Sequence, residues 1–458
     1  MKTCSVSSHS VMDNKRFDAC YYLSDGIAFR RAITQTPYPI LSFADVTSRI
    51  FYGIRANRIY VTNKEHALPF LTGAAIMQSD LTKTKLVSRK YTPAIEEMTL
   101  KAGWVLVTRS GTIGQTAWSN KLFEGKYGSE DIIRLVPNGK MKGGVLYSYL
   151  ASVYGQTLLT QGSFGAVIQH IEPSFISSLP IPQFGEAFQK EVDALIQEST
   201  HLREEAADAL NEAKEILNSW INAEFEKHYF QASVVSSKAI WDSLQYRLDP
   251  PALMNDGVKT MNRIIERMEH TTIGNINGKV FRPGIFKRIY VEDGIPYIKG
   301  SEIFLNNPFR RCDKLSRTRT PFIEEMAMKE GQILITCAGS VGDIKLITKE
   351  YEDKKSIGSQ DIIRLESNDE LYTKEYMFVY LQQPFVNDYI QSMKYGAVIE
   401  RIEPFHVESI PVVKPTKELS NEITTIIRNY MDFTYRAFNA EEKAISMVEQ
   451  EIEKWNKQ

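Results

Sequence analysis

The chain contains one module twice, and this repeat limits its fold more than any other feature. Residues 89–114 align with residues 317–342 without a gap, and 13 of the 26 positions are identical. The other matching segments keep the same order in both halves: 16–18 with 247–249, 58–61 with 288–291, 128–135 with 358–365, and 165–173 with 396–404. Because the offset drifts only from 228 to 231 residues, we expect each half to fold into the same unit.

Four motifs carry the repeat. T-P-x-I-E-E-M begins at Thr92 and at Thr320, and G-x-x-L-x-T-x-x-G-x-x-G follows it from Gly103 and from Gly331. The later matches read G-S-x-D-I-I-R-L and G-A-V-I-x-x-I-E-P. The glycines of the second motif come directly after a β-branched run, which is typical of a strand that ends in a tight turn.

Each module ends in a long helical pattern. Residues 185–227 contain no proline, and Gly185 is their only glycine. Apolar or small residues recur there at heptad spacing, as they do near the C-terminus. We therefore predict long helices over 185–229 and 416–458, each roughly 60 Å long. A helix of that length must bury its apolar stripe, and the other helix is the economical partner, although each could instead pack only on its own domain.

The segments between the helices combine strand and helix patterns. We expect strands over 105–108, 132–135 and 333–336, and helices over 144–155 and 374–391. The predicted class is α+β, with two similar mixed α/β domains and two long helices. The chain has 458 residues, of which 43% are hydrophobic, so it can build more than one core. No apolar run approaches the ~18–20 residues of a membrane span, and we expect a cytoplasmic protein.

The net charge of −1 hides an uneven distribution. Residues 13–110 carry 14 Lys/Arg and 8 Asp/Glu, and residues 240–330 carry 15 and 12. In contrast, residues 185–227 carry 4 and 11, and residues 416–458 carry 6 and 8. Positive lobes joined by negative connectors are typical of a protein that touches DNA phosphates with its lobes alone. Ordinary surface variation is the alternative.

Basic residues gather at corresponding places just ahead of T-P-x-I-E-E-M. The candidates for DNA contact there are Lys83, Lys85, Arg89 and Lys90 in the first module, with Arg310, Arg311, Lys314, Arg317 and Arg319 in the second. Such side chains could hold the backbone or reach guanine in the major groove. A solvated charged turn is the alternative.

The glycine turn supplies further candidates for DNA contact: Arg109, Ser110, Thr112 and Ser340. Its frame is kept, while neighbouring polar positions differ between the copies. The exchanges are Arg109-Ser110 against Cys337-Ala338, Glu130 against Gln360, and Gln169-His170 against Glu400-Arg401. Two domains that recognise different base sequences should keep the same frame and exchange polar side chains in this way. Neutral drift after duplication would give the same pattern.

Motifs for catalysis are absent. The chain has no phosphate-binding glycine loop, its four cysteines are far apart, and its seven histidines are scattered. Asp249-Pro250-Pro251-Ala252 is close to the D-P-P-[YF] motif of amino-methyltransferases but lacks the aromatic residue. We therefore predict no catalytic residue, no metal site and no cofactor in this chain.

The motifs, their order and their duplication resemble the specificity (S) subunit of type I restriction-modification systems. The resemblance implies two target recognition domains, 1–184 and 230–415, each reading one half of a split DNA site. It implies that the helices 185–229 and 416–458 pack antiparallel as a coiled coil with pseudo-twofold symmetry, and that they dock two DNA adenine-methyltransferase (M) subunits. Restriction motor (R) subunits would join them, and S-adenosylmethionine, ATP and Mg²⁺ would bind only to the partners.

Three alternatives remain at this point. The chain could serve a type IIB-like or related DNA-methylation defence complex, which the sequence alone does not separate from a type I system. It could be a methyltransferase whose altered D-P-P segment still binds S-adenosylmethionine. It could also be a structural adaptor that places two lobes on a coiled coil without contacting DNA.

Overall fold

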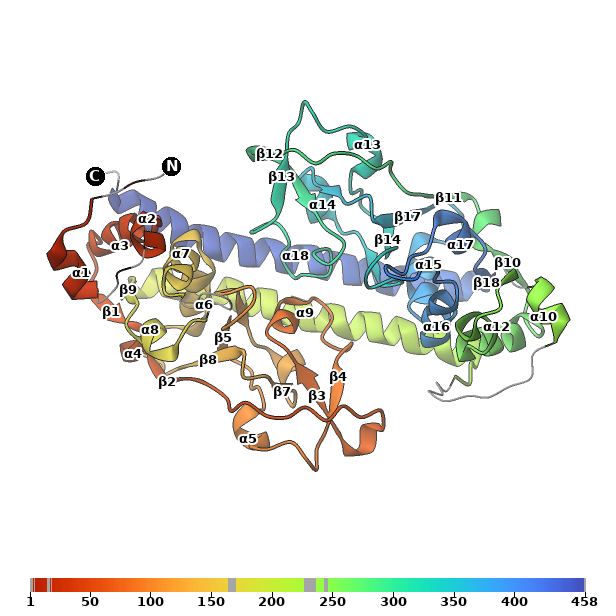
Figure 1. Ribbon diagram of the computed structural model, residues 1–458, viewed down its shortest axis with the longest axis horizontal. Coiled ribbons are helices and arrows are strands. Elements are labelled where there is room, and N and C mark those ends of the chain that lie inside the picture. Colours follow the sequence, from red (N-terminus) through yellow and green to blue (C-terminus); the bar gives the residue numbers. More distant parts are fainter. Residues whose placement is uncertain are drawn as a thin grey trace. The chain divides into compact units, whose positions relative to one another are not determined.

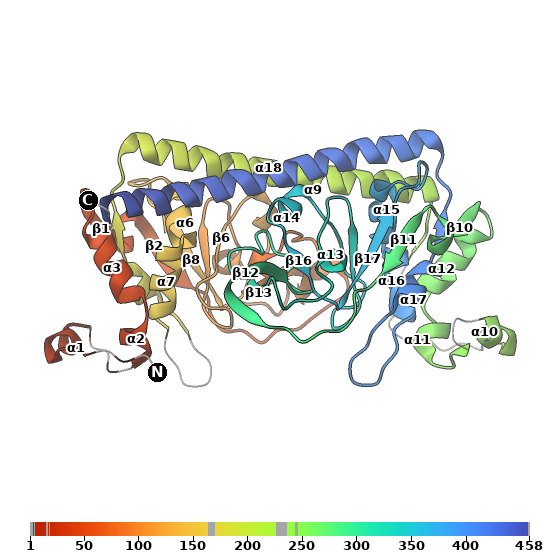
Figure 2. The same cartoon turned by 90° about the horizontal axis from the view of Figure 1, so that it is seen from above.

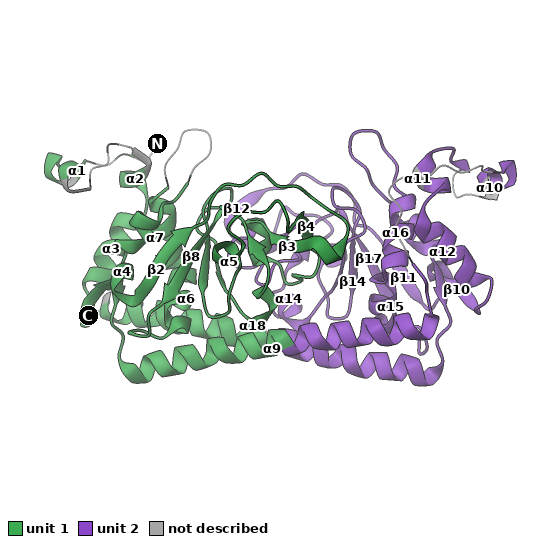
Figure 3. Cartoon of the chain, turned by 90° about the horizontal axis from the view of Figure 1, so that it is seen from below, with its two compact units in different colours: residues 1–204, 436–458 green, residues 205–435 purple. Residues whose placement is uncertain are grey.

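The computed structural model describes residues 3, 5–14, 17, 19–163, 170–225, 236–242 and 246–456. The chain divides into two compact units: unit 1 comprises residues 1–204 and 436–458, and unit 2 comprises residues 205–435 (Figure 3). The long helices α9 (Glu186–Ile221) and α18 (Lys417–Asn456) each contribute one part to each unit. The predicted segments 16, 18 and 165–169 lie outside the described residues.

Short helices and strands make up the rest of each unit (Figure 1). Those of unit 1 are α1 (Ser8–Asn14), α2 (Ala19–Leu23), α3 (Gly26–Thr34), β1 (Ile40–Ser42), α4 (Phe43–Val46), β2 (Thr47–Tyr52), β3 (Ala67–Leu71), β4 (Lys85–Ser88), α5 (Ile95–Met98), β5 (Val105–Thr108), β6 (Thr116–Trp118), β7 (Tyr127–Gly128), β8 (Ile132–Pro137), α6 (Gly143–Ala151), α7 (Val153–Gln161), α8 (Pro173–Ser177) and β9 (Pro180–Pro182). Those of unit 2 are α10 (Ser237–Asp242), α11 (Pro250–Leu253), α12 (Asp256–Ile265), β10 (His270–Thr272), β11 (Gly278–Phe281), β12 (Tyr290–Ile298), β13 (Asp313–Leu315), α13 (Ile323–Met326), β14 (Ile333–Thr336), β15 (Ile344–Leu346), α14 (Lys349–Asp353), β16 (Ile357–Gly358), β17 (Ile362–Ser367), α15 (Lys374–Leu381), α16 (Pro384–Ser392), α17 (Pro404–Glu408) and β18 (Pro411–Val413).

The two units build the same sheets. In unit 1 the strand orders are β2-β8-β5-β6, β4-β3-β7 and β1-β9, and in unit 2 they are β11-β17-β14-β15, β13-β12-β16 and β10-β18. The registers also agree, since Leu106 lies opposite Arg134 in unit 1 and Leu334 lies opposite Arg364 in unit 2. The predicted α+β class with two similar mixed modules is therefore confirmed.

The central strand of each four-stranded sheet is buried on both faces. In unit 1, Val105 and Val107 of β5 belong to the core under α6 and α7, whereas Leu106 belongs to a separate core with Leu71 and Phe123. All three β5 residues have no exposed surface. Burial on both faces explains why the sequence shows an unbroken apolar run here instead of an alternating pattern.

Two predicted helices are each divided in two. The segment 144–155 forms α6 and α7, and Ser152 begins the second of these by accepting a hydrogen bond from the Gly155 amide (3.2 Å). The segment 374–391 forms α15 and α16, which lie beside the four-stranded sheet of unit 2 (Figure 2). Pro384 is the first residue of α16, where its missing N–H costs nothing, so the break between these helices follows from the sequence.

In unit 1 the beginning of α9 packs beside the end of α18 (Figure 1). The ring of Phe184, two residues before the start of α9, lies 6.2 Å from that of Trp455 near the end of α18. Farther along, Arg203 forms a 2.7 Å ion pair with Glu441, whose side chain is only 5% exposed. Tyr147 of α6 donates a hydrogen bond to the same carboxylate, so the helix pair is also fixed to the module.

In unit 2 the end of α9 packs beside the beginning of α18. Leu217 and Ile221 are buried in one core with Leu419 and Ile423. The two helices therefore run antiparallel within each unit, and the prediction that they pack on each other is confirmed. The alternative, in which each helix packs only on its own domain, is wrong.

The first long helix ends sooner than predicted. It stops at Ile221 instead of residue 229, because Asn222 adopts a left-handed conformation (φ 50°). Asparagine tolerates this conformation and commonly ends helices. Arg267 then donates to the carbonyl oxygens of Ile221 (2.5 Å) and Asn222 (2.7 Å), which have no partner within the helix. Residues 226–235 lie outside the described part of the chain.

A buried arginine joins the two larger sheets of unit 1. Arg134 of β8 has no exposed surface, and it donates to the carbonyl oxygens of Ile132 (2.7 Å), Gly128 (2.8 Å) and Met98 (3.2 Å). These carbonyls belong to β8, to β7 of the other sheet and to the end of α5. Burial lowers the pKa of Arg134 to about 10, so it stays charged at neutral pH.

Unit 2 repeats this arrangement. Arg364 of β17 is also fully buried, and it donates to the carbonyl oxygens of Ile362 (2.9 Å), Gly358 (3.0 Å) and Met326 (3.3 Å). Burial again lowers its pKa to about 10. The arginine of G-S-x-D-I-I-R-L thus binds the end of T-P-x-I-E-E-M, which explains physically why both motifs occur in both modules.

The buried arginine predicts a large loss of stability on removal. In Arg134→Met the side chain keeps much of its volume, but several buried carbonyl oxygens lose their donor. We expect the free energy of unfolding of the unit to fall by about 3–5 kcal/mol, measured by urea titration of the full chain. Arg49→Met is the matched control, because Arg49 is exposed, forms an ion pair with Glu97 and lies 3.8 Å from the ring centre of Phe51, and it binds no buried carbonyl oxygen. Its effect should stay within about 1 kcal/mol, and equal effects of both variants would contradict the assignment.

Candidate nucleic-acid interface

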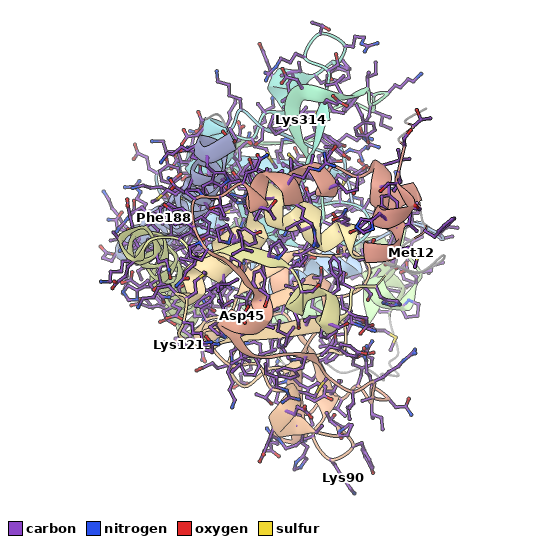
Figure 4. The ribbon with its side chains drawn as sticks, turned by 90° about the vertical axis from the view of Figure 1, so that its left-hand side faces the viewer. Met12, Asp45, Lys90, Lys121, Phe188 and Lys314 are labelled. Carbon is purple, nitrogen blue, oxygen red and sulfur yellow. The ribbon has the colours of Figure 1, made fainter. Side chains whose placement is uncertain are left out.

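The predicted basic cluster of unit 1 surrounds the edge strand β4. Lys83 precedes this strand, Lys85 lies in it, and Arg89 and Lys90 follow it, all of them exposed. Figure 4 shows Lys90 at the tip of the unit with its side chain directed away from the ribbon. The Lys90 ammonium lies 5.3 Å from the ring centre of Tyr91. Exposed cations beside an aromatic ring can contact a phosphate backbone.

The predicted basic cluster of unit 2 occupies the corresponding place. Arg310 and Arg311 precede the edge strand β13, Lys314 lies in it (Figure 4), and Arg317 and Arg319 follow it. Arg317 also donates to the carbonyl oxygen of residue 294 (3.1 Å). The contact of these side chains with DNA stays a prediction.

Sequence reasoning missed an exposed tyrosine beside each basic cluster. Tyr60 is 50% exposed and pairs with Val87 of β4, and Tyr290 is 53% exposed and pairs with Leu315 of β13. The Lys85 ammonium lies 5.2 Å from the Tyr60 ring centre. The available signal was the R-I-Y-V match between the modules. Its tyrosine is kept in both copies although it is not part of the core.

The glycine turn is held by the threonine before it. Thr108 donates a side-chain hydrogen bond to the Thr112 carbonyl and accepts one from the Gln115 amide (2.9 Å). Gly111 and Gly114 have φ angles of 75° and 76°, which favour glycine. The frame of the motif therefore has a structural cause. Thr112 and its counterpart Ser340 lie exposed on the turn.

Thr336 of unit 2 holds its turn in the same way. It donates to the Ser340 carbonyl and accepts a hydrogen bond from the Asp343 amide (3.0 Å). Each turn also pairs with the last exchanged position, because Ser110 forms a β-bridge with His170 and Ala338 forms one with Arg401. The structure thus brings together residues 110 and 170, and residues 338 and 401.

Arg109 has an internal role. Its guanidinium forms a 2.6 Å ion pair with Glu172 and lies 4.0 Å from the ring centre of Tyr52, and its side chain is only 16% exposed. Ser110 donates to the Asp131 carboxylate (2.6 Å). Direct contact of Arg109 and Ser110 with DNA stays a prediction, but both side chains already have partners in unit 1.

Unit 2 builds the same ion pair from different positions. Its strand register places Phe281 opposite Arg364, as Phe51 lies opposite Arg134, so Arg282 corresponds to Tyr52. Arg282 pairs with Glu403 (3.2 Å), the counterpart of Glu172.

The thiol of Cys337 stands where unit 1 has Arg109, and it lies 4.0 Å from a guanidinium nitrogen of Arg282. The exchange between Arg109 and Cys337 therefore preserves a guanidinium–carboxylate pair at the turn.

The exchange of Glu130 for Gln360 in G-S-x-D-I-I-R-L is compensated as well. In unit 1, Arg58 pairs with Glu130 (2.8 Å). In unit 2, where Gln360 replaces the glutamate, the corresponding Arg288 pairs with Asp361 (3.6 Å). This arginine also faces an aromatic ring in both units.

The described residues offer little for catalysis. No group of three or more His, Cys, Asp or Glu side chains among them could hold a metal ion. Asp249, at the altered D-P-P segment, binds Arg247 (2.7 Å) and precedes the short helix α11, so its carboxylate has a structural role. No helix in the described part of the chain has the length and apolar character of a membrane span.

The two forms of the turn predict an energetic coupling. Tyr52→Arg alone places a second cation beside Arg109, and Arg109→Cys alone leaves Glu172 without its partner. The double variant recreates the arrangement of unit 2. We expect each single change to lower the free energy of unfolding and the pair to recover about 1 kcal/mol or more of the summed loss, measured by urea titration. Additive losses would contradict the correspondence.

Comparison with known proteins tests the resemblance. Residues 271–445 match the family model described as type I restriction modification DNA specificity domain. A search of curated proteins finds no significant match.

Among solved structures, the S subunit of a type I restriction-modification system from M. genitalium is 13% identical, with 91% of this chain and 96% of that chain covered and a TM-score of 0.36. The HsdS subunit from Thermoanaerobacter tengcongensis is 12% identical, with 91% and 97% covered and a TM-score of 0.28.

The family match covers 175 of the 458 residues of the chain. That match supports the resemblance to specificity subunits over residues 271–445. The second module is therefore similar to a type I restriction-modification DNA specificity domain, and the first module has the same sheets in the same strand order.

Proposed function

We propose that the chain is the DNA-specificity subunit of a type I restriction-modification complex and reads a bipartite site, one block with each module. One observation carries this proposal. The family match lies in the second module, and the first module has the same sheets in the same strand order. A duplicated specificity domain would have two recognition surfaces, one in each module.

The edge-strand cations are the proposed phosphate contacts. In unit 1, Lys83, Lys85, Arg89 and Lys90 are exposed around β4, and unit 2 has its basic cluster around β13. Phosphate contacts of this kind supply affinity without sequence information and make binding depend on salt. Base contacts would then come from neighbouring turns.

The long helices are the proposed spacer and docking platform. Residues 185–227, which include α9, carry 11 acidic and 4 basic side chains, so this part of the chain is repelled by DNA. A stiff spacer would keep the two modules at a fixed separation, and the site should therefore contain two blocks separated by unread base pairs.

The exposed helix surfaces would dock two DNA adenine-methyltransferase subunits, with motor subunits joining them. S-adenosylmethionine, ATP and Mg²⁺ would act in those partners. Mapping methylated adenines in a host that carries this chain and its methyltransferase tests the proposal directly.

The spacer role predicts how the site responds to insertion. Seven residues, about two helical turns, are added to α9 between residues 204 and 205 and to α18 between 435 and 436. The modules stay intact, so both sequence blocks should persist while the preferred spacer becomes longer. Methylation mapping measures both properties at once.

The control places the same seven residues in the exposed turn at 138–140, outside the helices. This insertion should leave the spacer unchanged. If the spacer does not lengthen with the helix insertion, or if it changes equally with the control, the proposed spacer role of the long helices is contradicted.

A further inference from the structure

The exchanges between the modules are of two kinds. Arg109 and Glu130 of unit 1 form ion pairs that unit 2 rebuilds with Arg282 and Arg288. The change from Ser110 to alanine removes a hydroxyl that only serves an internal aspartate. These exchanges rewire internal contacts, and they require no difference in what the modules bind.

The exchange at residue 401 is different. Arg401 is partly exposed. Among the described residues, no hydrogen bond or ion pair involves its guanidinium group. In contrast, Arg282 and Arg288 of the same unit both have carboxylate partners. An arginine with five unused donors beside a retained turn is available for a ligand.

The backbone of Arg401 is fixed on two sides. Its amide donates to the Tyr395 carbonyl (2.9 Å), and its carbonyl accepts from the Tyr395 amide (3.1 Å). On the other side it forms the β-bridge with Ala338 of the glycine turn. The next residue, Ile402, is bonded to the Cys337 carbonyl (3.0 Å). A side chain on such a scaffold starts from one defined position, which recognition of a base edge requires.

The loop that carries Arg401 is anchored at its base. Tyr395 donates to Glu403 (2.9 Å), and its ring stacks on His406 at 5.5 Å. Figure 2 shows the loop between α16 and α17 extending from the body of unit 2. Gly396 has a φ of 106° and lies so close to the Ile399 carbonyl that a side chain would not fit. The loop shape is thus determined by the retained glycine, while the arginine at its base differs from the first module.

We propose that Arg401 is a specificity-determining residue that reads a guanine in the block recognised by the second module. Arginine binds the O6 and N7 atoms of guanine through two parallel hydrogen bonds in the major groove. His170 holds the corresponding place in the first module, and it has fewer donors and no such fork. This proposal rests on the proposed function, because it names a residue within one of the two DNA-reading modules.

The test compares two arginines of unit 2. The full chain, assembled with its methyltransferase subunits, selects from a library of randomised DNA duplexes, with Arg401→Ala and Arg401→His beside the wild type. We expect both variants to lose discrimination at one G·C pair of the second block by roughly 5- to 150-fold. The first block and the spacer should not change.

Arg319→Ala is the matched control, because Arg319 is exposed on the basic cluster. It should weaken binding to all sequences equally and reduce the salt dependence by about one phosphate contact.

The outcomes separate the two proposals. If the wild type selects a bipartite site and both Arg401 variants select the same site, the role of Arg401 is overturned and the proposed function stands. A uniform loss of affinity in the Arg401 variants, like that of Arg319→Ala, also overturns the role. If the wild type selects no bipartite site, the proposed function itself fails. Arg401→His keeps the test valid if the alanine variant does not fold.

Discussion

A buried guanidinium group that binds only backbone carbonyls is the interaction on which both modules depend. Arg134 and Arg364 each join a strand of the four-stranded sheet to the three-stranded sheet and to a short helix. Taking a charge into a core is costly, and several aligned carbonyl dipoles offset that cost only if all of them are in place. The arginine therefore fixes the relative positions of three segments at once, and the glycine turn extends from the strand next to it.

This rigid frame explains how one scaffold can carry two different surfaces. The contacts that shape the turn are either kept, as with Thr108 and Thr336, or rebuilt with the same chemistry from other positions, as with Arg109 and Arg282. Each module has a guanidinium–carboxylate pair at its turn. The arginine of the pair comes from a different position in each module, because Arg109 corresponds to Cys337 and Arg282 corresponds to Tyr52. Side chains beyond that pair can then change without disturbing the fold, and Arg401 lies at such a place.

Much of the fold could be predicted because residues that are identical in both copies of the module identify positions on which the structure depends. The strands at 105–108 and 333–336, the glycine turns and the paired long helices follow from apolar runs, glycine spacing and heptads. The end of the first helix was missed because an asparagine alone does not mark a helix end, and the arginine that binds its last carbonyl oxygens, Arg267, lies 45 positions away from Asn222. Local patterns do not reveal a cap supplied from that distance.

The site was harder to predict than the fold. Arg109 reads in the sequence as an exposed cation in a loop, but its partner Glu172 lies 63 residues later. The correspondence between Tyr52 and Arg282 became visible only through the strand register. The buried arginines were also missed, since an arginine within an apolar strand reads as its one solvent-facing residue. Their identity in both copies was the available signal.

The central claim is that each of the two similar modules recognises its own DNA block independently. A replacement taken from the chain's own sequence tests this claim. Residues 83–173 are replaced by residues 311–404, so that both modules carry the recognition segment of the second, Arg401 included, and methylated adenines are mapped in a host that carries the partner methyltransferase. The account predicts a symmetric site built from two copies of the second block, with the original spacer. A site that keeps its original first block would contradict it, since the exchanged segment would then not contain what reads the DNA.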